Sequence, residues 1–143
     1  MTTFMATFMS NGVAAPASSI PASAYTAVIA GGAVVVDIRT HAQRAAEGAL
    51  PGALAIAADL LEARLDPSSS ARLGVASDPR VRWVLISDDG TLASMAVQAL
   101  HLLGVRNASH VDGGFLALER RGLVAAGDSA AHVRREAAAI TAH

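Results

Sequence analysis

Two strand-like segments constrain the fold of this chain more than any other feature. Ala33–Ile38 is a nearly continuous run of β-branched residues, and Val81–Ile86 has the strongest strand pattern in the chain. Runs of this kind are typical of strands that are buried on both faces of a sheet. Helical patterns alternate with them, most clearly Leu92–Val105, which is apolar at most positions, is expected to lie against the sheet and has Gly104 as a stop signal. The alternation predicts an α/β domain with an open, mostly parallel sheet and helices on both faces.

The remaining predicted elements are shorter and are bounded by turn-forming residues. Thr40 is expected to cap a helix that runs to Ala46, and the serines in 68–70 are expected to cap one more helical turn. The other predicted elements are a helix in 21–30, a strand in 54–57, a helix from Asp59 that stops before Pro67, a strand in 108–111 and a helix in 115–122.

The chain has the size and composition of a single domain. Its 143 residues, of which 52% are hydrophobic, suit one core and one binding or active site at most. Residues 1–19 lack sustained periodicity and predict a flexible N-terminal leader. Residues 20–123 contain the alternating elements and form the predicted domain. In 124–143, Asp128 can cap an amphipathic helix, so we expect a C-terminal helix on the domain surface.

The composition excludes several classes of function. The chain contains no cysteine, so it has no disulfide, no thiolate metal ligand and no thiol nucleophile. A net charge of −1, without clustered arginine and aromatic residues, argues against nucleic acid as a partner. The most apolar region, Ala24–Val36, is shorter than the roughly 20 residues of a spanning helix, and the N-terminus lacks the pattern of a signal peptide. We therefore expect a cytoplasmic monomer or homodimer without a cofactor, whose protein or small-molecule partner is unknown.

Two loops are expected to form the functional site, because ligands of open α/β sheets bind at the carboxyl ends of strands. One loop follows Ile38, and the other begins at Ser87 in the segment VLISDDGTLAS, Val84–Ser94. The letters SDDGTL coincide with the aspartate loop of haloacid-dehalogenase-type phosphatases. That chemistry requires a carboxylate in place of Ser87 and a lysine, and the chain contains no lysine. A serine hydrolase would need a glycine-framed nucleophile elbow, which does not surround Ser87.

Four motifs together resemble the rhodanese-like superfamily in its small single-domain type. In chain order they are VVVDIR in 34–39, GALPGALAI in 48–56, the strand-loop-helix segment in 84–105, and HVDGGFLALERRGL in 110–123. They are similar to the family's D-x-R, G-H-I-P-G-A, active-loop and D-G-G-x-x-x-W elements. The family motif residues carried over are Asp37, Arg39, Pro51, Gly52, Gly113 and Gly114.

The resemblance implies a loop that carries a catalytic cysteine at the end of the central strand. In the family this cysteine holds a persulfide, and the amides of the curled loop and of the following helix stabilise the anion. The corresponding residue here is Ser87, and serine forms no stable persulfide. Asp88 and Asp89 add negative charges that would repel an anionic donor by about 1 kcal/mol or more each. Two further departures are Ala49 in place of the family's histidine and Leu118 in place of its tryptophan.

The function expected from this loop is binding or regulation without sulfur transfer. The degenerate active loop comprises Ser87, Asp88, Asp89, Gly90, Thr91, Leu92 and Ala93. One alternative is residual or altered transferase or hydrolase activity at Ser87. A second is a pocket for Mg²⁺ or Ca²⁺ formed by Asp37, Asp88 and Asp89, because these acids stand at the ends of neighbouring strands. The histidines lack metal-type spacing, and no catalytic residue or metal ligand is assigned.

Overall fold

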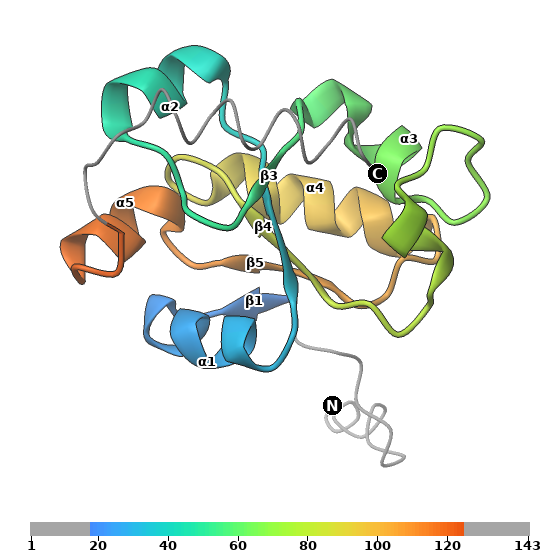
Figure 1. The fold of residues 1–143 in the computed structure, drawn as a ribbon, viewed down its shortest axis with the longest axis horizontal. Coiled ribbons are helices and arrows are strands. Elements are labelled where there is room, and N and C mark those ends of the chain that lie inside the picture. The colour runs from blue at the N-terminus through green and yellow to red at the C-terminus, as the bar shows by residue number, and fades with distance from the viewer. Residues whose placement is uncertain (1–17, 125–143) are drawn as a thin grey trace, which may run out of the picture.

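A single sheet of five parallel strands forms the centre of the computed structural model, which describes residues 18–124. The strand order is β1-β5-β4-β2-β3, and every pair of neighbours is parallel. Helices cover both faces of the sheet (Figure 1). The strands are β1 (Ser19–Ile20), β2 (Val34–Asp37), β3 (Leu54–Ala55), β4 (Trp83–Ile86) and β5 (Ala108–Val111). The helices are α1 (Tyr25–Ala30), α2 (His41–Glu47), α3 (Leu61–Leu65), α4 (Thr91–Leu102) and α5 (Gly114–Arg120), with 3₁₀ helices at Ala22–Ala24, Ala58–Leu60 and Gly74–Ser77.

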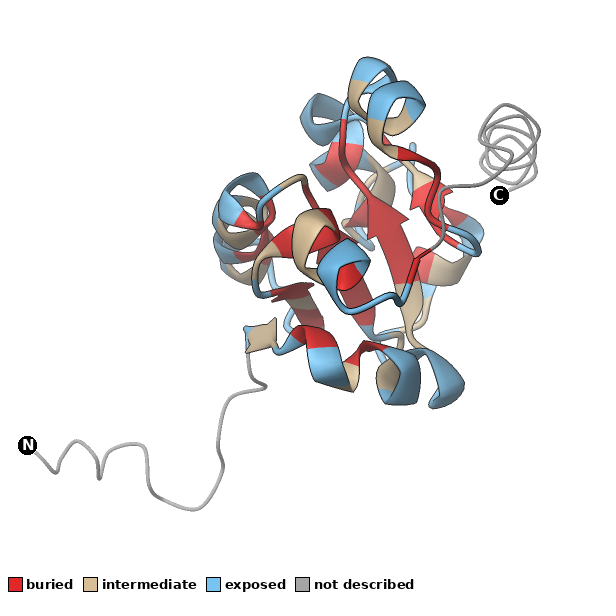
Figure 2. Cartoon of the chain, turned by 90° about the vertical axis from the view of Figure 1, so that its left-hand side faces the viewer, coloured by how far each residue is buried: buried red, intermediate tan, exposed pale blue. Residues whose placement is uncertain are grey.

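Alternating side chains of the central strands form two cores, one on each face of the sheet. On one face Val84 packs with Tyr25 of α1 and Phe115 of α5. On the other face Leu85 packs with Val97 of α4, in a core that α3 also covers. The whole of β4 is buried, as the red strands at the centre of Figure 2 show. The central strand therefore follows the pattern of a strand buried on both faces.

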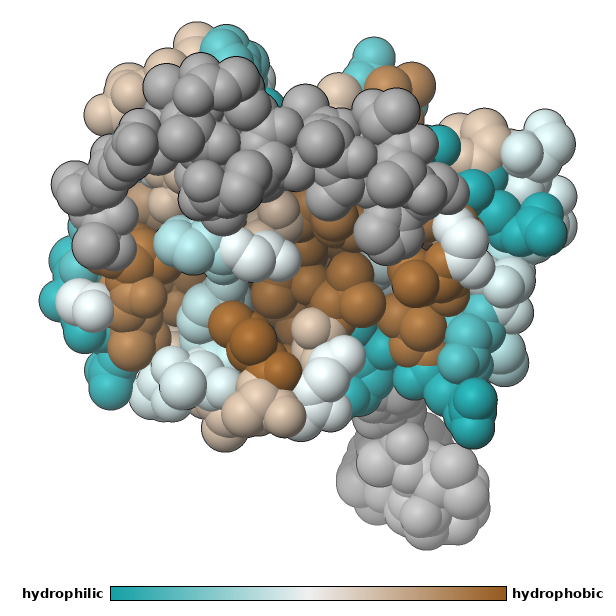
Figure 3. Space-filling model, viewed as in Figure 1, coloured by the Kyte–Doolittle hydropathy of each residue, from teal (hydrophilic) through white to brown (hydrophobic). Residues whose placement is uncertain are grey.

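Apolar side chains also reach the surface of the domain. On the face seen in Figure 3 they form brown patches with hydrophilic side chains at the margins. Within residues 18–124, the large apolar side chains that are exposed are Ile29, Leu60, Leu92, Met95, Leu102, Leu103 and Leu123. Four of these seven lie on α4 or directly after it. Among the described residues, no helix is both long enough and apolar enough to cross a membrane.

The predicted α/β class, the parallel sheet and the helices on both of its faces are confirmed. Thr40 caps α2 as expected, because its Oγ1 accepts a hydrogen bond from Gln43 N at 3.0 Å. Gln43 Oε1 in turn accepts one from Thr40 N at 3.0 Å, which completes a capping box. The strand predicted in 54–57 is shorter than expected and ends at Ala55.

The prediction for the serines in 68–70 is wrong. They cap no helical turn, since the next 3₁₀ helix begins only at Gly74 and has no side-chain cap. Ser69 instead bonds within the loop, where its Oγ accepts a hydrogen bond from Ala71 N at 3.1 Å. Serine competes in this way for nearby backbone groups, so a serine-rich segment predicts a turn as readily as a helix start.

Both ends of the described segment are part of the packed structure. Ser19, assigned to the leader by the sequence, already belongs to β1, which pairs with β5. At the other end, Val124 is buried in the core that contains α1 and α5. The rest of the predicted leader and the predicted C-terminal helix lie outside the described residues.

Candidate functional site

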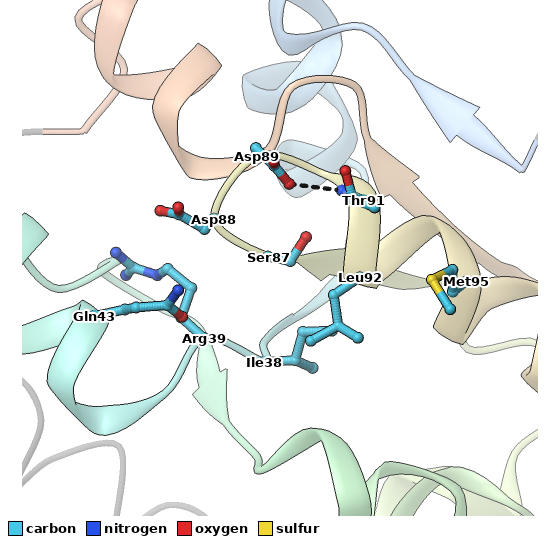
Figure 4. A pocket seen from close by; sticks show the side chains of 9 residues that line it. All are labelled: Ile38, Arg39, Gln43, Ser87, Asp88, Asp89, Thr91, Leu92 and Met95. Carbon is cyan, nitrogen blue, oxygen red and sulfur yellow. Dashed lines mark hydrogen bonds between the residues drawn. The ribbon is translucent and has the colours of Figure 1, made fainter.

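The loop Ser87–Gly90 joins the central strand to α4 at the carboxyl edge of the sheet, and its side chains bond to the first turn of that helix. Ser87 is 3% exposed, and its hydroxyl accepts a hydrogen bond from Ala93 N at 3.1 Å. Asp89 Oδ1 accepts one from Thr91 N at 3.0 Å (Figure 4). This bond holds the pKa of the Asp89 carboxyl below its usual range. Two amides that a helix start leaves unpaired are therefore bound by the loop itself.

The turn between β5 and α5 holds the loop in place. Phe115 N donates a hydrogen bond to Ser87 O at 2.9 Å, and Leu116 N donates one to Asp88 O at 3.1 Å. Gly114 permits this approach, because its φ is +60° and a Cβ at this position would lie 2.3 Å from Ser87 O. The Gly-Gly motif forms the tight turn that the sequence predicts. It also allows the start of α5 to bind the loop carbonyls.

Asp37 and Arg39 form a buried ion pair beside the loop. Asp37 is fully buried and Arg39 is 1% exposed. Arg39 Nη2 donates to Asp37 Oδ2 at 2.8 Å, and Arg39 Nε donates to Asp37 Oδ1 at 3.0 Å. The guanidinium also donates to Gly48 O at 3.0 Å and to Glu47 Oε1 at 3.3 Å, and it lies 3.8 Å from the centre of the Phe115 ring. Arg39 therefore ties together the ends of β2, α2 and α5.

This ion pair contradicts the hypothesis of a Mg²⁺ or Ca²⁺ pocket at Asp37, Asp88 and Asp89. Both carboxylate oxygens of Asp37 accept hydrogen bonds from Arg39, so they are not available to a cation. Across residues 18–124, no group of three or more histidine, aspartate or glutamate side chains is placed to hold a metal ion. Asp37 and Asp88 do stand at the ends of neighbouring strands, as expected. The ion pair with Arg39 nevertheless occupies the Asp37 carboxylate.

A pocket of about 300 Å³ opens beside the loop, with α2 on one side and the start of α4 on the other (Figure 4). Five of the seven predicted loop residues line the pocket, and Gly90 and Ala93 do not. Gly90 is the left-handed N-cap of α4, and the side chain of Ala93 is fully buried. The lining residues are Ile38, Arg39, Gln43, Ser87, Asp88, Asp89, Thr91, Leu92 and Met95.

The sequence pattern did not identify every residue of this pocket. Ile38, Gln43 and Met95 line it although none of them was among the predicted site residues. Met95 lies one helical turn after Leu92, so the helical spacing of the α4 segment was the available signal. Pro51 and Gly52, by contrast, lie in an exposed turn before β3 and do not line the pocket.

A pair of carboxyl groups lies next to the pocket, where the last residue of α2, Glu47, approaches Asp88. Partial burial raises the pKa of the Glu47 carboxyl, and the neighbouring Asp88 carboxyl raises it further, whereas Arg39 lowers it. Oδ1 of Asp88 is buried and has no hydrogen-bond partner among the described residues. The negative charge of this pair is therefore only partly neutralised, by the contact of Glu47 with Arg39.

Replacing Glu47 with glutamine is expected to stabilise the domain more at neutral pH than at acidic pH. Folding raises the pKa of the Glu47 carboxyl above its ordinary value of 4.5. The protonated carboxyl therefore contributes to the stability of the folded state below pH 4.5, and this contribution is lost as the pH rises through the pKa of the folded state. Glutamine keeps an acceptor for Arg39 and adds a donor toward Asp88. Urea unfolding of both proteins at about pH 4 and about pH 7 measures the effect. Parallel profiles for wild type and Glu47→Gln would contradict it, and Glu62→Gln on the exposed side of α3 is the control.

Together these features define a class of protein. A fully parallel α/β domain carries a pocket at the carboxyl end of its central strand, and a loop and a helix start form the wall of that pocket. The chain belongs to the rhodanese-like domain family, whose model matches residues 21–121. The match covers β2 to β5 and all five helices, so it includes the whole pocket.

Solved structures with similar folds agree with this assignment. A protein of unknown function from Rhodopseudomonas palustris, described as a possible tyrosine phosphatase, has a TM-score of 0.66 and 23% identity over 73% of this chain and 80% of its own. The human single domain sulfurtransferase has a TM-score of 0.60 and 25% identity over 73% of this chain and 97% of its own. A rhodanese-related protein from Thermoplasma volcanium has a TM-score of 0.57 and 20% identity over 76% of this chain and 96% of its own. No match was found among curated proteins.

Proposed function

We propose that this rhodanese-like domain does not transfer sulfur and acts as a binding or regulatory module through the pocket beside Ser87. The observation that carries the proposal is the Ser87 hydroxyl, which stands where the family has its cysteine nucleophile and accepts the Ala93 amide at 3.1 Å. The chain contains no cysteine that could replace it. A serine hydroxyl does not ionise as a thiol does and forms no stable persulfide.

The hydrogen bonds of the loop support the same proposal. An anion at the start of a helix is held by the free amides of the first turn. Here Ala93 N is bound by Ser87 and Thr91 N is bound by Asp89, so two such amides are already occupied. Asp88 and Asp89 also line the pocket with negative charge, which opposes an anionic donor by about 1 kcal/mol or more for each carboxylate. The pocket therefore suits a ligand other than thiosulfate or a phosphate ester.

Hydrolysis at Ser87 has less support. A serine nucleophile needs a neighbouring base that accepts its proton. In the part of the chain that the structure describes, the Ser87 hydroxyl has no hydrogen bond to a histidine or carboxylate, and its partner is the Ala93 amide. The bond from the Ala93 amide also occupies a lone pair of the Ser87 oxygen, which a nucleophile would use for attack. We therefore keep binding as the proposed function.

A sulfur-transfer assay with thiosulfate and cyanide tests the proposal. Wild-type protein is expected to form no thiocyanate above the blank, because Ser87 cannot carry the sulfur. Ser87→Cys alone is expected to stay near the blank, since the two acids of the loop remain. The triple variant with Ser87→Cys, Asp88→Asn and Asp89→Asn is expected to exceed Ser87→Cys by about thirtyfold, which corresponds to the removal of two charges at roughly 1 kcal/mol each.

The control for nonspecific thiol chemistry is Ser70→Cys, which places a cysteine in an exposed loop that does not line the pocket. It is expected to stay at the blank. Thiocyanate formation by the wild-type protein would show that the proposal of an inactive domain is wrong. Equal rates for Ser87→Cys and the triple variant would show that the loop charges do not exclude the donor.

A further inference from the structure

One face of α4 is exposed in the part of the chain that the structure describes. The helix packs on the sheet through Ala93, Val97 and Leu100, which are fully buried. The opposite face carries an apolar stripe, here called the α4 stripe. Its members and exposed fractions are Leu92 at 46%, Met95 at 63%, Leu102 at 89% and Leu103 at 43%. Contiguous apolar groups of this kind on a small domain mark surfaces that bind partners.

The α4 stripe runs directly into the pocket beside Ser87. Leu92 and Met95 belong to the stripe and also line the pocket. In Figure 4 these two side chains lie on the α4 side of the pocket, and Asp88 lies on the opposite side, near Arg39. The side of the pocket with Asp88 and the neighbouring Glu47 is here called the acidic side. A segment bound along the stripe would therefore also reach the acidic side of the pocket.

Among the described residues, the charge of that acidic side is neutralised only in part, by the contact of Arg39 with Glu47. Asp88 Oδ1 is buried without a hydrogen-bond partner, and Glu47 lies beside it. Arg39 is the cation in contact with Glu47, and it already donates to both oxygens of Asp37 and to Gly48 O. A guanidinium or ammonium group presents several donors and a positive charge, which is what a carboxyl pair of this kind binds best.

From these three observations we infer that the site docks a segment of a partner protein that combines apolar side chains with a basic one. The apolar side chains lie on the α4 stripe, and the arginine or lysine enters the pocket beside Asp88. An amphipathic helix supplies this combination, with its apolar face in contact with α4. The inference rests on the proposed binding function and specifies the chemistry of the partner.

Fluorescence anisotropy with three synthetic helical peptides tests the inference on the full chain. The first peptide has leucines on one face and arginines beside them, the second has glutamate in place of each arginine, and the third has serine in place of each leucine. The arginine peptide is expected to bind, and the other two are expected to bind about tenfold more weakly or not at all. Asp88→Asn and Leu102→Ser are each expected to weaken binding of the arginine peptide by about tenfold.

Two matched variants control for charge and apolarity elsewhere on the surface. Asp59→Asn removes an exposed carboxylate, and Leu60→Ser removes an exposed leucine, both outside the stripe and the pocket. Neither is expected to change the affinity. Equal binding of the arginine and glutamate peptides, or no binding of any peptide, would overturn the inference. Either result leaves the thiocyanate assay unaffected, so it can be distinguished from a failure of the proposed function.

Other occupants of the stripe give different results. A synthetic peptide of residues 125–143 contains Arg134 and Arg135. If this peptide displaces the arginine peptide and Asp88→Asn abolishes the displacement, the occupant belongs to the chain itself and the inference of a separate partner is wrong. The inference is also wrong if the wild-type protein dimerises and Leu102→Ser makes it monomeric. A monomeric protein that the 125–143 peptide does not bind supports it.

Discussion

Replacing Asp37 with alanine is expected to destabilise the domain by about 3–5 kcal/mol, the loss typical of breaking a buried ion pair from one side. Asp37 is fully buried, and its carboxylate accepts bonds from Arg39 Nη2, Arg39 Nε and the Arg39 backbone amide. Without the carboxylate, the Arg39 guanidinium stays buried against the Phe115 ring with Glu47 as its remaining charged partner. A buried charge that has lost its main partner costs far more than the net stabilisation by the intact pair.

Urea unfolding followed by circular dichroism measures this effect. Tyr25→Phe is the matched control, because Tyr25 lies in the core that contains Phe115 and its buried hydroxyl has no hydrogen-bond partner among the described residues. Removing that hydroxyl is expected to change the free energy of unfolding by less than about 1 kcal/mol, or to raise it. A loss for Asp37→Ala no larger than that of Tyr25→Phe would contradict the assigned role of the ion pair.

Gly114→Ala is expected to cost about 3 kcal/mol or more, because backbone strain and a steric clash act together. At a φ of +60°, the added Cβ would lie 2.3 Å from Ser87 O, 2.6 Å from Gly90 N and 2.7 Å from Asp88 O. These atoms are backbone, so the loop itself would have to move. Its movement would break the bonds from the start of α5 to the loop carbonyls, including Phe115 N to Ser87 O.

Gly122→Ala separates the two causes. Gly122 has a similar φ of +69°, but a Cβ there would meet nothing within 4 Å. This control is expected to lose about 1 kcal/mol from backbone strain alone. Urea unfolding gives the difference between the two variants, and hydrogen exchange at Phe115 N reports whether the loop has separated from α5. Equal losses for both variants, with unchanged exchange at Phe115 N, would contradict the role of Gly114 as the support of the loop.

The position of the pocket could be predicted from the sequence because it depends on local signals. A buried strand that ends at Ile86 and a helix that starts at Thr91 place the loop at the sheet edge in any parallel α/β domain. The glycine motif likewise indicated a turn next to the loop. The role of Gly114 in the approach of α5 to the loop was not predicted, since it depends on contacts across 27 residues of chain, from 87 to 114.

The electrostatics of the pocket could not be predicted in the same way. The sequence hypothesis grouped Asp37 with the loop acids, whereas the structure pairs Asp37 with Arg39. It assigned no role to Glu47, which packing brings to Asp88. The net field at a site depends on which charges are paired and how deeply they are buried, and residue spacing alone contains neither quantity.

The amino-acid sequence by itself determined the alternation of strands and helices from α1 to α5, the absence of a thiol nucleophile and the place of Ser87 at the end of the central strand. These properties follow from residue identity and local periodicity, which the linear chain contains in full. Only the tertiary structure decided that Asp37 is neutralised, that Glu47 and Asp88 share the acidic side of the pocket, and that one face of α4 stays exposed. Pairing and burial depend on distances between segments that are far apart in the chain, so they are set when the helices pack on the sheet.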